Sequence, residues 1–135
     1  MTEEKKRQIR VVAAEINRNG KYLITQRQEK AVLPLLWEFP GGKVEENETD
    51  EEALVRELKE RLFCRIAVRG ESMSTMKEYE KYTVDFHVYS CDLLDDHLKI
   101  GNCRDYRWVG LDEFENFEFP SADQDTVDKL LNLKK

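Results

Sequence analysis

The sequence predicts an α+β fold in which two helices pack against a β-sheet. Segments typical of strands outnumber the two segments with helical periodicity. Strands also lie between the two helices along the chain, so the order reads β-β-α-β-β-β-α. The length of 135 residues is that of one compact domain, without internal repeats or low-complexity linkers. We therefore expect a polar N-terminal tail at residues 1–7 and a single domain at residues 8–135.

Apolar alternation and turn residues mark the expected strands. Asn19-Gly20 lies between two apolar segments, which is the sequence signal of a β-hairpin. Pro40-Gly41-Gly42 is expected to form a turn that ends a short extended segment. The expected strands cover residues 9–16, 21–28, 65–73, 82–91 and 106–109, and the short extended segment covers residues 37–39.

Two longer segments have the features of helices. Thr49 followed by Glu52 is a capping-box signature, so a helix is expected from about residue 50 to residue 62. A helical turn is expected at residues 111–116 and a closing amphipathic helix at residues 121–133. The side chains expected to face the core are Leu54, Val55, Leu58 and Leu62 in the first helix and Val127, Leu130 and Leu131 in the last.

Charge and cysteine content exclude several classes of protein. The net charge of −6 argues against a nucleic-acid-binding surface, although bound metal can still allow a small phosphorylated ligand. Three cysteines without a C-x-x-C pair argue against a disulfide framework or a zinc site and favour a reducing cytoplasm. The charged start and the lack of a long apolar run argue against a secretory signal and a membrane span. A monomer and a homodimer both remain open.

The first helix carries the acidic residues that point to chemistry. Glu57 and Glu60 are one helical turn apart, where like charges repel unless a cation lies between them. Oxygen ligands without nearby sulfur favour Mg²⁺ or Mn²⁺. Glu48 lies before the helix and can pair with Arg56 to hold the acidic face in place. A Glu-x-x-Glu taken alone is typical of a solvated helix face, but the whole spacing after Gly42 favours a metal site.

This spacing resembles the Nudix box of the MutT-like pyrophosphohydrolases. The matching positions are Gly42, Glu48, Arg56-Glu57, Leu58 and Glu60. Residues 36–45, which read LWEFPGGKVE, resemble the subgroup of MutT and CTP pyrophosphohydrolases. Residues 106–109 and 119–123 match later landmarks of that subgroup, so the resemblance covers about residues 8–133.

The resemblance implies an α/β/α sandwich with a mixed sheet. It also implies Mg²⁺-dependent attack of water on a nucleoside triphosphate, releasing pyrophosphate and a monophosphate, with Mn²⁺ as a substitute ion. Glu57 and Glu60 would ligate the metal together with the Gly41 carbonyl. Glu48 and Arg56 would complete the catalytic group as a supporting pair.

The same resemblance implies three residues that bind substrate. Arg27 matches an arginine that reaches phosphate, and its alternative interpretation is a solvated residue at a strand end. Asp123 matches a position that contacts the base, where an acid could accept a hydrogen from an exocyclic amino group. Its alternative interpretation is a helix N-terminal acid stabilised by the helix dipole. Phe39 could line the base pocket or belong to the core.

Three positions depart from the family pattern. Arg61 replaces a metal-binding acid and can form a salt bridge with Glu57, which predicts weaker metal binding. Phe63 replaces a glycine that normally takes a left-handed conformation, so we expect a different helix end. Asn102 occupies the place of an expected glutamate and cannot act as a carboxylate base, while Asp105 is the nearest acid.

These departures leave alternative functions open. The first is an active hydrolase slowed by Arg61, which could instead contact phosphate and partly replace a cation. The second is a nucleotide-binding or regulatory protein of the same fold with little catalysis. A third is an enzyme for other diphosphate-linked substrates with a different metal arrangement.

Overall fold

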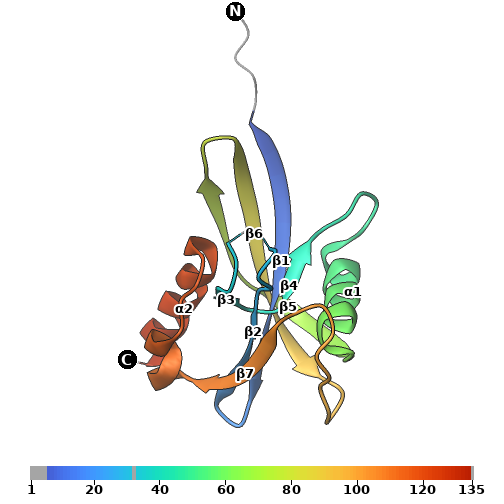
Figure 1. The fold of residues 1–135 in the computed structure, drawn as a ribbon, viewed down its shortest axis with the longest axis vertical. Coiled ribbons are helices and arrows are strands. Elements are labelled where there is room, and N and C mark those ends of the chain that lie inside the picture. Colours follow the sequence, from blue (N-terminus) through green and yellow to red (C-terminus); the bar gives the residue numbers. More distant parts are fainter. Residues whose placement is uncertain (1–5, 32, 135) are drawn as a thin grey trace, which may run out of the picture.

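Seven strands form one mixed sheet in the computed structural model, which describes residues 6–31 and 33–134 (Figure 1). The neighbouring strands follow the order β3-β2-β1-β6-β5, while β4 pairs with β1 and β7 pairs with β2. Strands β1 and β6 are parallel, and the other pairs are antiparallel. The elements are β1 (Arg7–Arg18), β2 (Lys21–Gln26), β3 (Trp37–Glu38), β4 (Gly41–Lys43), α1 (Asp50–Leu62), β5 (Ile66–Glu78), β6 (Tyr82–Leu93), β7 (Asp105–Gly110), the 3₁₀ helix η1 (Leu111–Asn116) and α2 (Ser121–Lys134).

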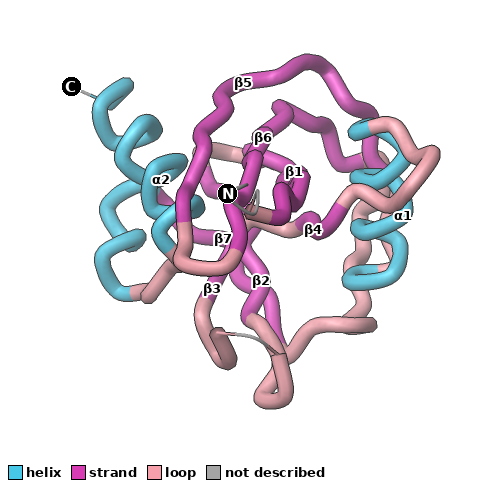
Figure 2. The backbone as a smooth tube through the Cα atoms, turned by 90° about the horizontal axis from the view of Figure 1, so that it is seen from above, coloured by secondary structure: helices cyan, strands magenta, loops and turns pink. Residues whose placement is uncertain are grey.

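Helices α1 and α2 lie on opposite sides of the strands, which confirms the α+β sandwich (Figures 1 and 2). Each helix covers a separate apolar cluster. Leu54, Leu58 and Leu62 of α1 belong to one cluster, and Val127 and Leu130 of α2 belong to the other. Because strand β1 contributes to both clusters, the sheet separates two cores rather than bordering one.

The predicted buried face of α1 is wrong at Val55, whose surface is 42% exposed. Leu54, Leu58 and Leu62 recur every four residues and follow one stripe along the helix. The next position on the buried side belongs to Glu57, not Val55. The buried face therefore extends to Glu57 on one flank of the leucine stripe and leaves Val55, on the other flank, exposed.

Strand β4 replaces the turn that the glycines were expected to form. Gly41–Lys43 pairs with β1 in an antiparallel register, with Gly41 opposite Ala13. A Cβ on Gly41 would lie 2.0 Å from the carbonyl oxygen of Val12, so a side chain here would prevent the two strands from approaching. The glycines therefore allow the backbones of β4 and β1 to lie close together. A sequence pattern alone does not distinguish glycines in this role from glycines in a turn.

The remaining expectations differ mainly at element ends. Asn19 (φ 56°) and Gly20 (φ 80°) both have positive φ, which confirms the predicted hairpin turn. Strand β5 extends to Glu78, five residues past its expected end, because it pairs with β6 as far as the hairpin between them. Residues 1–5 of the predicted tail lie outside the described residues, and β1 begins at Arg7. Cys64, Cys91 and Cys103 are free and buried.

Candidate functional site

A capping box fixes the start of helix α1, as the sequence predicts. The Glu52 N–H donates to Thr49 Oγ1 at 3.1 Å, and the Thr49 N–H donates to Glu52 Oε1 at 2.9 Å. These bonds satisfy two of the backbone N–H groups that a helix start leaves without partners. The acidic face that follows therefore starts from a defined position next to β4.

Arg56 clamps Glu48 to this face. Its Nε and Nη2 donate to the two Glu48 carboxylate oxygens at 2.7 and 2.9 Å, which is a bidentate pair. Nη2 also donates to the Lys43 carbonyl at 3.0 Å, so the guanidinium ties α1 to β4. The bond from Arg56, aided by the Glu45 N–H, lowers the pKa of Glu48 to about 2. Glu48 is therefore ionised throughout the neutral range.

Glu57 lies against the glycines of β4. A Cβ on Gly42 would lie 2.4 Å from Glu57 Cδ, so the carboxylate occupies the space that a side chain would need. Glu57 Oε1 accepts a bond from Arg56 Nη1 at 2.9 Å, and Oε2 accepts one from Arg61 Nε at 3.1 Å. The carboxylate is buried and each of its oxygens is bound to an arginine.

Glu60 is the more open of the two expected metal ligands. Its side chain is 51% exposed, and its Oε2 lies 3.5 Å from Arg56 Nη1. Two carboxylates one turn apart suit a hard divalent cation. Within residues 6–31 and 33–134, however, no three His, Cys, Asp or Glu side chains gather as a metal-binding group. The metal site expected from the sequence, with Glu57, Glu60 and the Gly41 carbonyl, would therefore depend on only two protein carboxylates.

Arg61 forms the salt bridge with Glu57 that its spacing predicts. Its Nη1 also lies 3.6 Å from Glu38 Oε2 and donates a long bond of 3.4 Å to the Asn102 carbonyl. The guanidinium thus stands between two carboxylates from different elements, α1 and β3. Asn102 contacts the Arg61 guanidinium through its backbone carbonyl and not through its side chain.

The expected change at the end of α1 is wrong, because Phe63 itself takes the left-handed conformation (φ 51°, ψ 38°). Its ring is 60% exposed, and its N–H donates to the Lys59 carbonyl. The loop after β6 supplies the stabilisation, since the Lys99, Gly101 and Asn102 N–H groups donate to the last carbonyls of α1. These distant bonds hold a conformation that phenylalanine alone disfavours.

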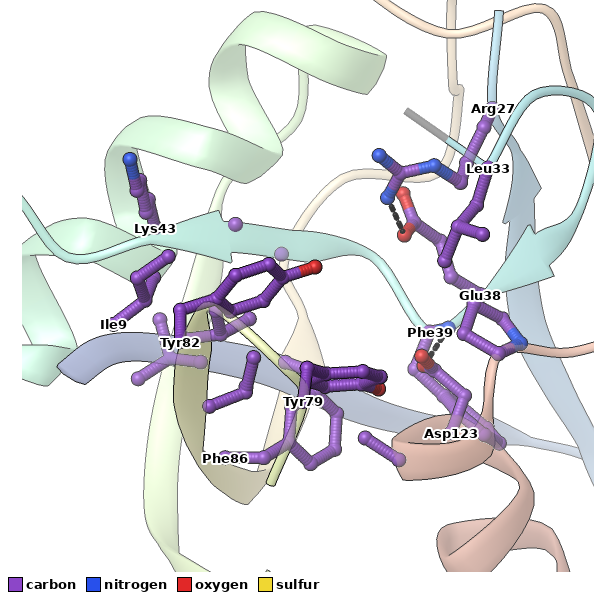
Figure 3. Close-up of a pocket in the computed structure, with 18 of the residues that line it drawn as sticks. Ile9, Arg27, Leu33, Glu38, Phe39, Lys43, Tyr79, Tyr82, Phe86 and Asp123 are labelled. Atoms are coloured by element: carbon purple, nitrogen blue, oxygen red, sulfur yellow. Dashed lines mark hydrogen bonds and ion pairs between the residues drawn. The ribbon is translucent and has the colours of Figure 1, made fainter. Parts of the chain in front are cut away.

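A cavity of about 530 Å³ lies beside β4, and Gly41, Arg27, Phe39 and Asp123 line it (Figure 3). Arg27 follows the end of β2, and its Nη1 donates to Glu38 Oε1 at 2.8 Å. The structure therefore brings all three expected substrate-binding residues to one cavity. Asp105 is not among the described residues that line it, and its carboxylate pairs instead with Arg107 at 2.6 Å.

Asp123 has a different environment from the acids of α1. It is buried at the start of α2, and its Oδ1 accepts the Phe39 N–H at 3.1 Å (Figure 3). Burial and the nearby Glu38 carboxylate raise the pKa of Asp123 well above its usual range. A protonated Asp123 can both donate and accept a hydrogen bond. Phe39 belongs to the core through contacts with Phe114 and Phe119, and it also lines the cavity, while its contact with a base stays a prediction.

Glu38, Tyr79 and Tyr82 are among the lining residues that sequence reasoning missed. Glu38 is a buried acid between the aromatic residues Trp37 and Phe39, which was the available signal. Tyr79 and Tyr82 stack at 5.1 Å between ring centroids at the β5–β6 hairpin, and both line the cavity (Figure 3). The Tyr79 hydroxyl also lies 3.0 Å from Ser121 Oγ, which links the hairpin to α2. Two tyrosines at the ends of a hairpin turn carry no specific sequence signal.

Comparison with known families and proteins identifies this arrangement. The NUDIX domain family model matches residues 11–129, which includes the clamped acids and most of the cavity. The chain belongs to the Nudix family. The match spans β1 to most of α2, so the Nudix domain and the observed fold coincide.

Several Nudix proteins are similar to this chain over most of its length. It is 32% identical to the CTP pyrophosphohydrolase of Escherichia coli K12, over 93% of both chains. It is 35% identical to the 8-oxo-dGTP diphosphatase of Buchnera aphidicola subsp. Schizaphis graminum, over 91% of this chain and 92% of the relative. The crystal structure of the MutT protein from Methanosarcina mazei Go1 matches with a TM-score of 0.84 at 25% identity, covering 98% and 99% of the chains. Among the described residues, we find no helix with the length and apolar character needed to cross a membrane.

Proposed function

We propose that this protein is a Mg²⁺-dependent, MutT-like pyrophosphohydrolase that cleaves a nucleoside triphosphate to a monophosphate and pyrophosphate. Its observed basis is the clamped Glu57 beside a cavity that also holds Arg27 and a buried Asp123. The names of two relatives, CTP pyrophosphohydrolase and 8-oxo-dGTP diphosphatase, support a nucleotide substrate. Mn²⁺ is the expected substitute ion, and the cytoplasm is the expected location.

The acids of α1 serve the phosphate end of the substrate in this proposal. Glu57 and Glu60, with the Gly41 carbonyl, would hold the divalent ion, which when bound neutralises phosphate charge and activates water. Arg56 and Glu48 keep Glu57 in place through the bidentate pair and the bond at 2.9 Å. In the reaction the water oxygen would bond to the α- or β-phosphorus while the bond from that same phosphorus to the α,β-bridging oxygen breaks, so that monophosphate and pyrophosphate separate and one proton is released.

The cavity serves the nucleoside end. Arg27 would contact phosphate while Glu38 holds its guanidinium. Asp123 would contact the base, with its raised pKa making it a neutral hydrogen-bonding group. Phe39 positions Asp123 through its backbone N–H and closes the apolar side of the cavity.

A second candidate is a Nudix-fold nucleotide-binding or regulatory protein with little catalysis. The Arg61–Glu57 ion pair at 3.1 Å favours it, because a guanidinium competes with metal for that carboxylate. Both candidates share the cavity and the nucleotide ligand. They differ in turnover, which makes a single assay decisive.

The assay combines purified protein, millimolar Mg²⁺ or Mn²⁺, and a panel of NTPs, dNTPs, nucleotide sugars and dinucleoside polyphosphates. Product nucleotides and pyrophosphate are separated by chromatography, with Glu57→Gln as the inactive control. We expect metal-dependent monophosphate and pyrophosphate from at least one triphosphate. Nucleotide binding without metal-dependent product from any compound would support the second candidate and exclude the hydrolase.

A further inference from the structure

Arg61 is the centre of a continuous series of ion pairs that crosses the site. Glu38 lies between Arg27 and Arg61, at 2.8 and 3.6 Å, and Glu57 lies between Arg61 and Arg56, at 3.1 and 2.9 Å. Positive and negative groups alternate along this series from Arg27 to Arg56, which in turn binds Glu48. Arg61 therefore connects the acids of α1 to the acid on the cavity wall.

The Arg61 guanidinium is held by two hydrogen bonds, which use only some of its five N–H donors. Its Nε donates to Glu57, and its Nη1 donates to the Asn102 carbonyl. Within the described part of the chain, its Nη2 makes no hydrogen bond, although Arg61 lines the cavity and its side chain is 20% exposed. Arginine carries five N–H donors, so this side chain retains donors for a ligand in the cavity.

The surroundings of Arg61 suit a phosphate chain. It lines the cavity together with Gly41, Gly42 and Arg27, and glycine backbone permits close approach of a ligand. Glu38 Oε2 is buried and accepts no hydrogen bond from the described residues, so Arg61 compensates its charge from 3.6 Å. A guanidinium fixed at two sides binds phosphate with little loss of side-chain freedom.

We propose that Arg61 is a resident cation of this site, which binds the substrate's phosphate chain directly and allows nucleoside triphosphate to bind without a divalent ion. The inference rests on the proposed function for the identity of the ligand. It deepens that function, because the arginine then contributes to substrate binding instead of only obstructing metal. Turnover would still need the ion that Glu57 and Glu60 hold, so binding and hydrolysis would differ in their metal requirement.

The test measures nucleotide binding by calorimetry in EDTA, where hydrolysis does not interfere. The probes are α,β-methylene-CTP and CMP, followed by the corresponding guanine deoxynucleotides. The difference in binding free energy between the triphosphate analogue and the monophosphate isolates the contribution of the β- and γ-phosphates. This difference does not depend on which base the site prefers. We expect the wild type to prefer the triphosphate analogue by about tenfold or more, the value of a charged hydrogen bond.

Arg61→Gln should remove most of that preference, leaving the part that Arg27 contributes, and Arg61→Lys should lose less of it although lysine lacks the planar fork. Arg69→Gln is the matched control, since Arg69 is an exposed arginine on β5. Thermal unfolding checks that each variant folds. An undiminished preference in Arg61→Gln would overturn the inference. Wild-type binding that requires Mg²⁺ would also overturn it, although that result leaves the proposed function intact. Binding of no probe under either condition would overturn both.

Discussion

Two carboxylates, Glu48 and Asp123, show that the site has two different halves. The helical half consists of α1 with its acids and the loop that carries Glu48, and the cavity half consists of the residues around Asp123 that line the cavity. Glu48 is bound by both ends of the Arg56 fork, and this pairing lowers its pKa to about 2. Asp123 is buried beside another acid, Glu38, and its pKa is raised. The helical half therefore keeps Glu48 charged through a nearby arginine, whereas the cavity half favours a neutral Asp123 through burial. In the proposed function the first half would serve the cation and the second would hydrogen-bond to the base.

The largest expected effect comes from breaking the helical half at Gly42. Gly42→Ala would place a methyl group 2.4 Å from Glu57 Cδ and push the carboxylate away from its two arginines. We expect a loss of about hundredfold in metal-dependent turnover, as for other displacements of catalytic groups. Gly70→Ala is the control, because a Cβ at Gly70 meets nothing within 4 Å. Equal turnover in the two variants would show that the position of Glu57 does not control catalysis.

The second effect concerns the end of α1 next to Arg61. Gly101→Ala would place a Cβ 2.3 Å from the Glu60 carbonyl and 2.9 Å from the Phe63 ring, disrupting the loop that caps the helix. We expect the free energy of unfolding to fall by about 2 kcal/mol. Urea denaturation compares it with Gly70→Ala. A stability equal to that of the control would mean that the loop is not needed to end the helix.

The third effect tests the charge balance of the helical half. Arg61→Glu removes a cation from Glu57 and Glu38 and restores an acid to the family's metal-binding position. We expect Mn²⁺ affinity, measured by electron paramagnetic resonance, to rise at least about tenfold, and turnover to rise with it. Arg69→Glu has the same charge change at an exposed position. Unchanged metal affinity in Arg61→Glu would refute the competition between arginine and metal.

The smallest expected effect is a change in stability with pH, which tests the cavity half. Because the folded protein holds the Asp123 proton more tightly than the unfolded chain, wild-type stability falls as pH rises above the usual aspartate range. The amide side chain introduced by Asp123→Asn does not titrate, so the stability of this variant relative to wild type should increase as pH rises from about 4 to about 8. Thermal unfolding across pH measures this difference, with Asp128→Asn on the exposed side of α2 as the control. A flat difference for Asp123→Asn would refute the raised pKa.

Local sequence predicted the beginning of α1 and the first hairpin, because their stabilising contacts join residues three apart or less. Thr49 and Glu52 bond each other, and Asn19-Gly20 carries its own positive φ angles. The end of α1 was predicted wrongly because its partners, Lys99, Gly101 and Asn102, lie about 40 residues away. Strand β4 was missed for the same reason, since only its contact with β1 distinguishes it from a turn.

The sequence by itself determined the family, the α+β order of elements and the spacing that places Glu48, Arg56 and Glu57 together, because a helix turns a fixed number of residues into a fixed geometry. It also identified Arg61 as a departure. Only the tertiary structure decided that Arg61 reaches Glu38 of β3 in the cavity wall. It likewise decided that burial changes the pKa of Asp123. Charge environment depends on neighbours from β3 and α2, which helical periodicity cannot specify.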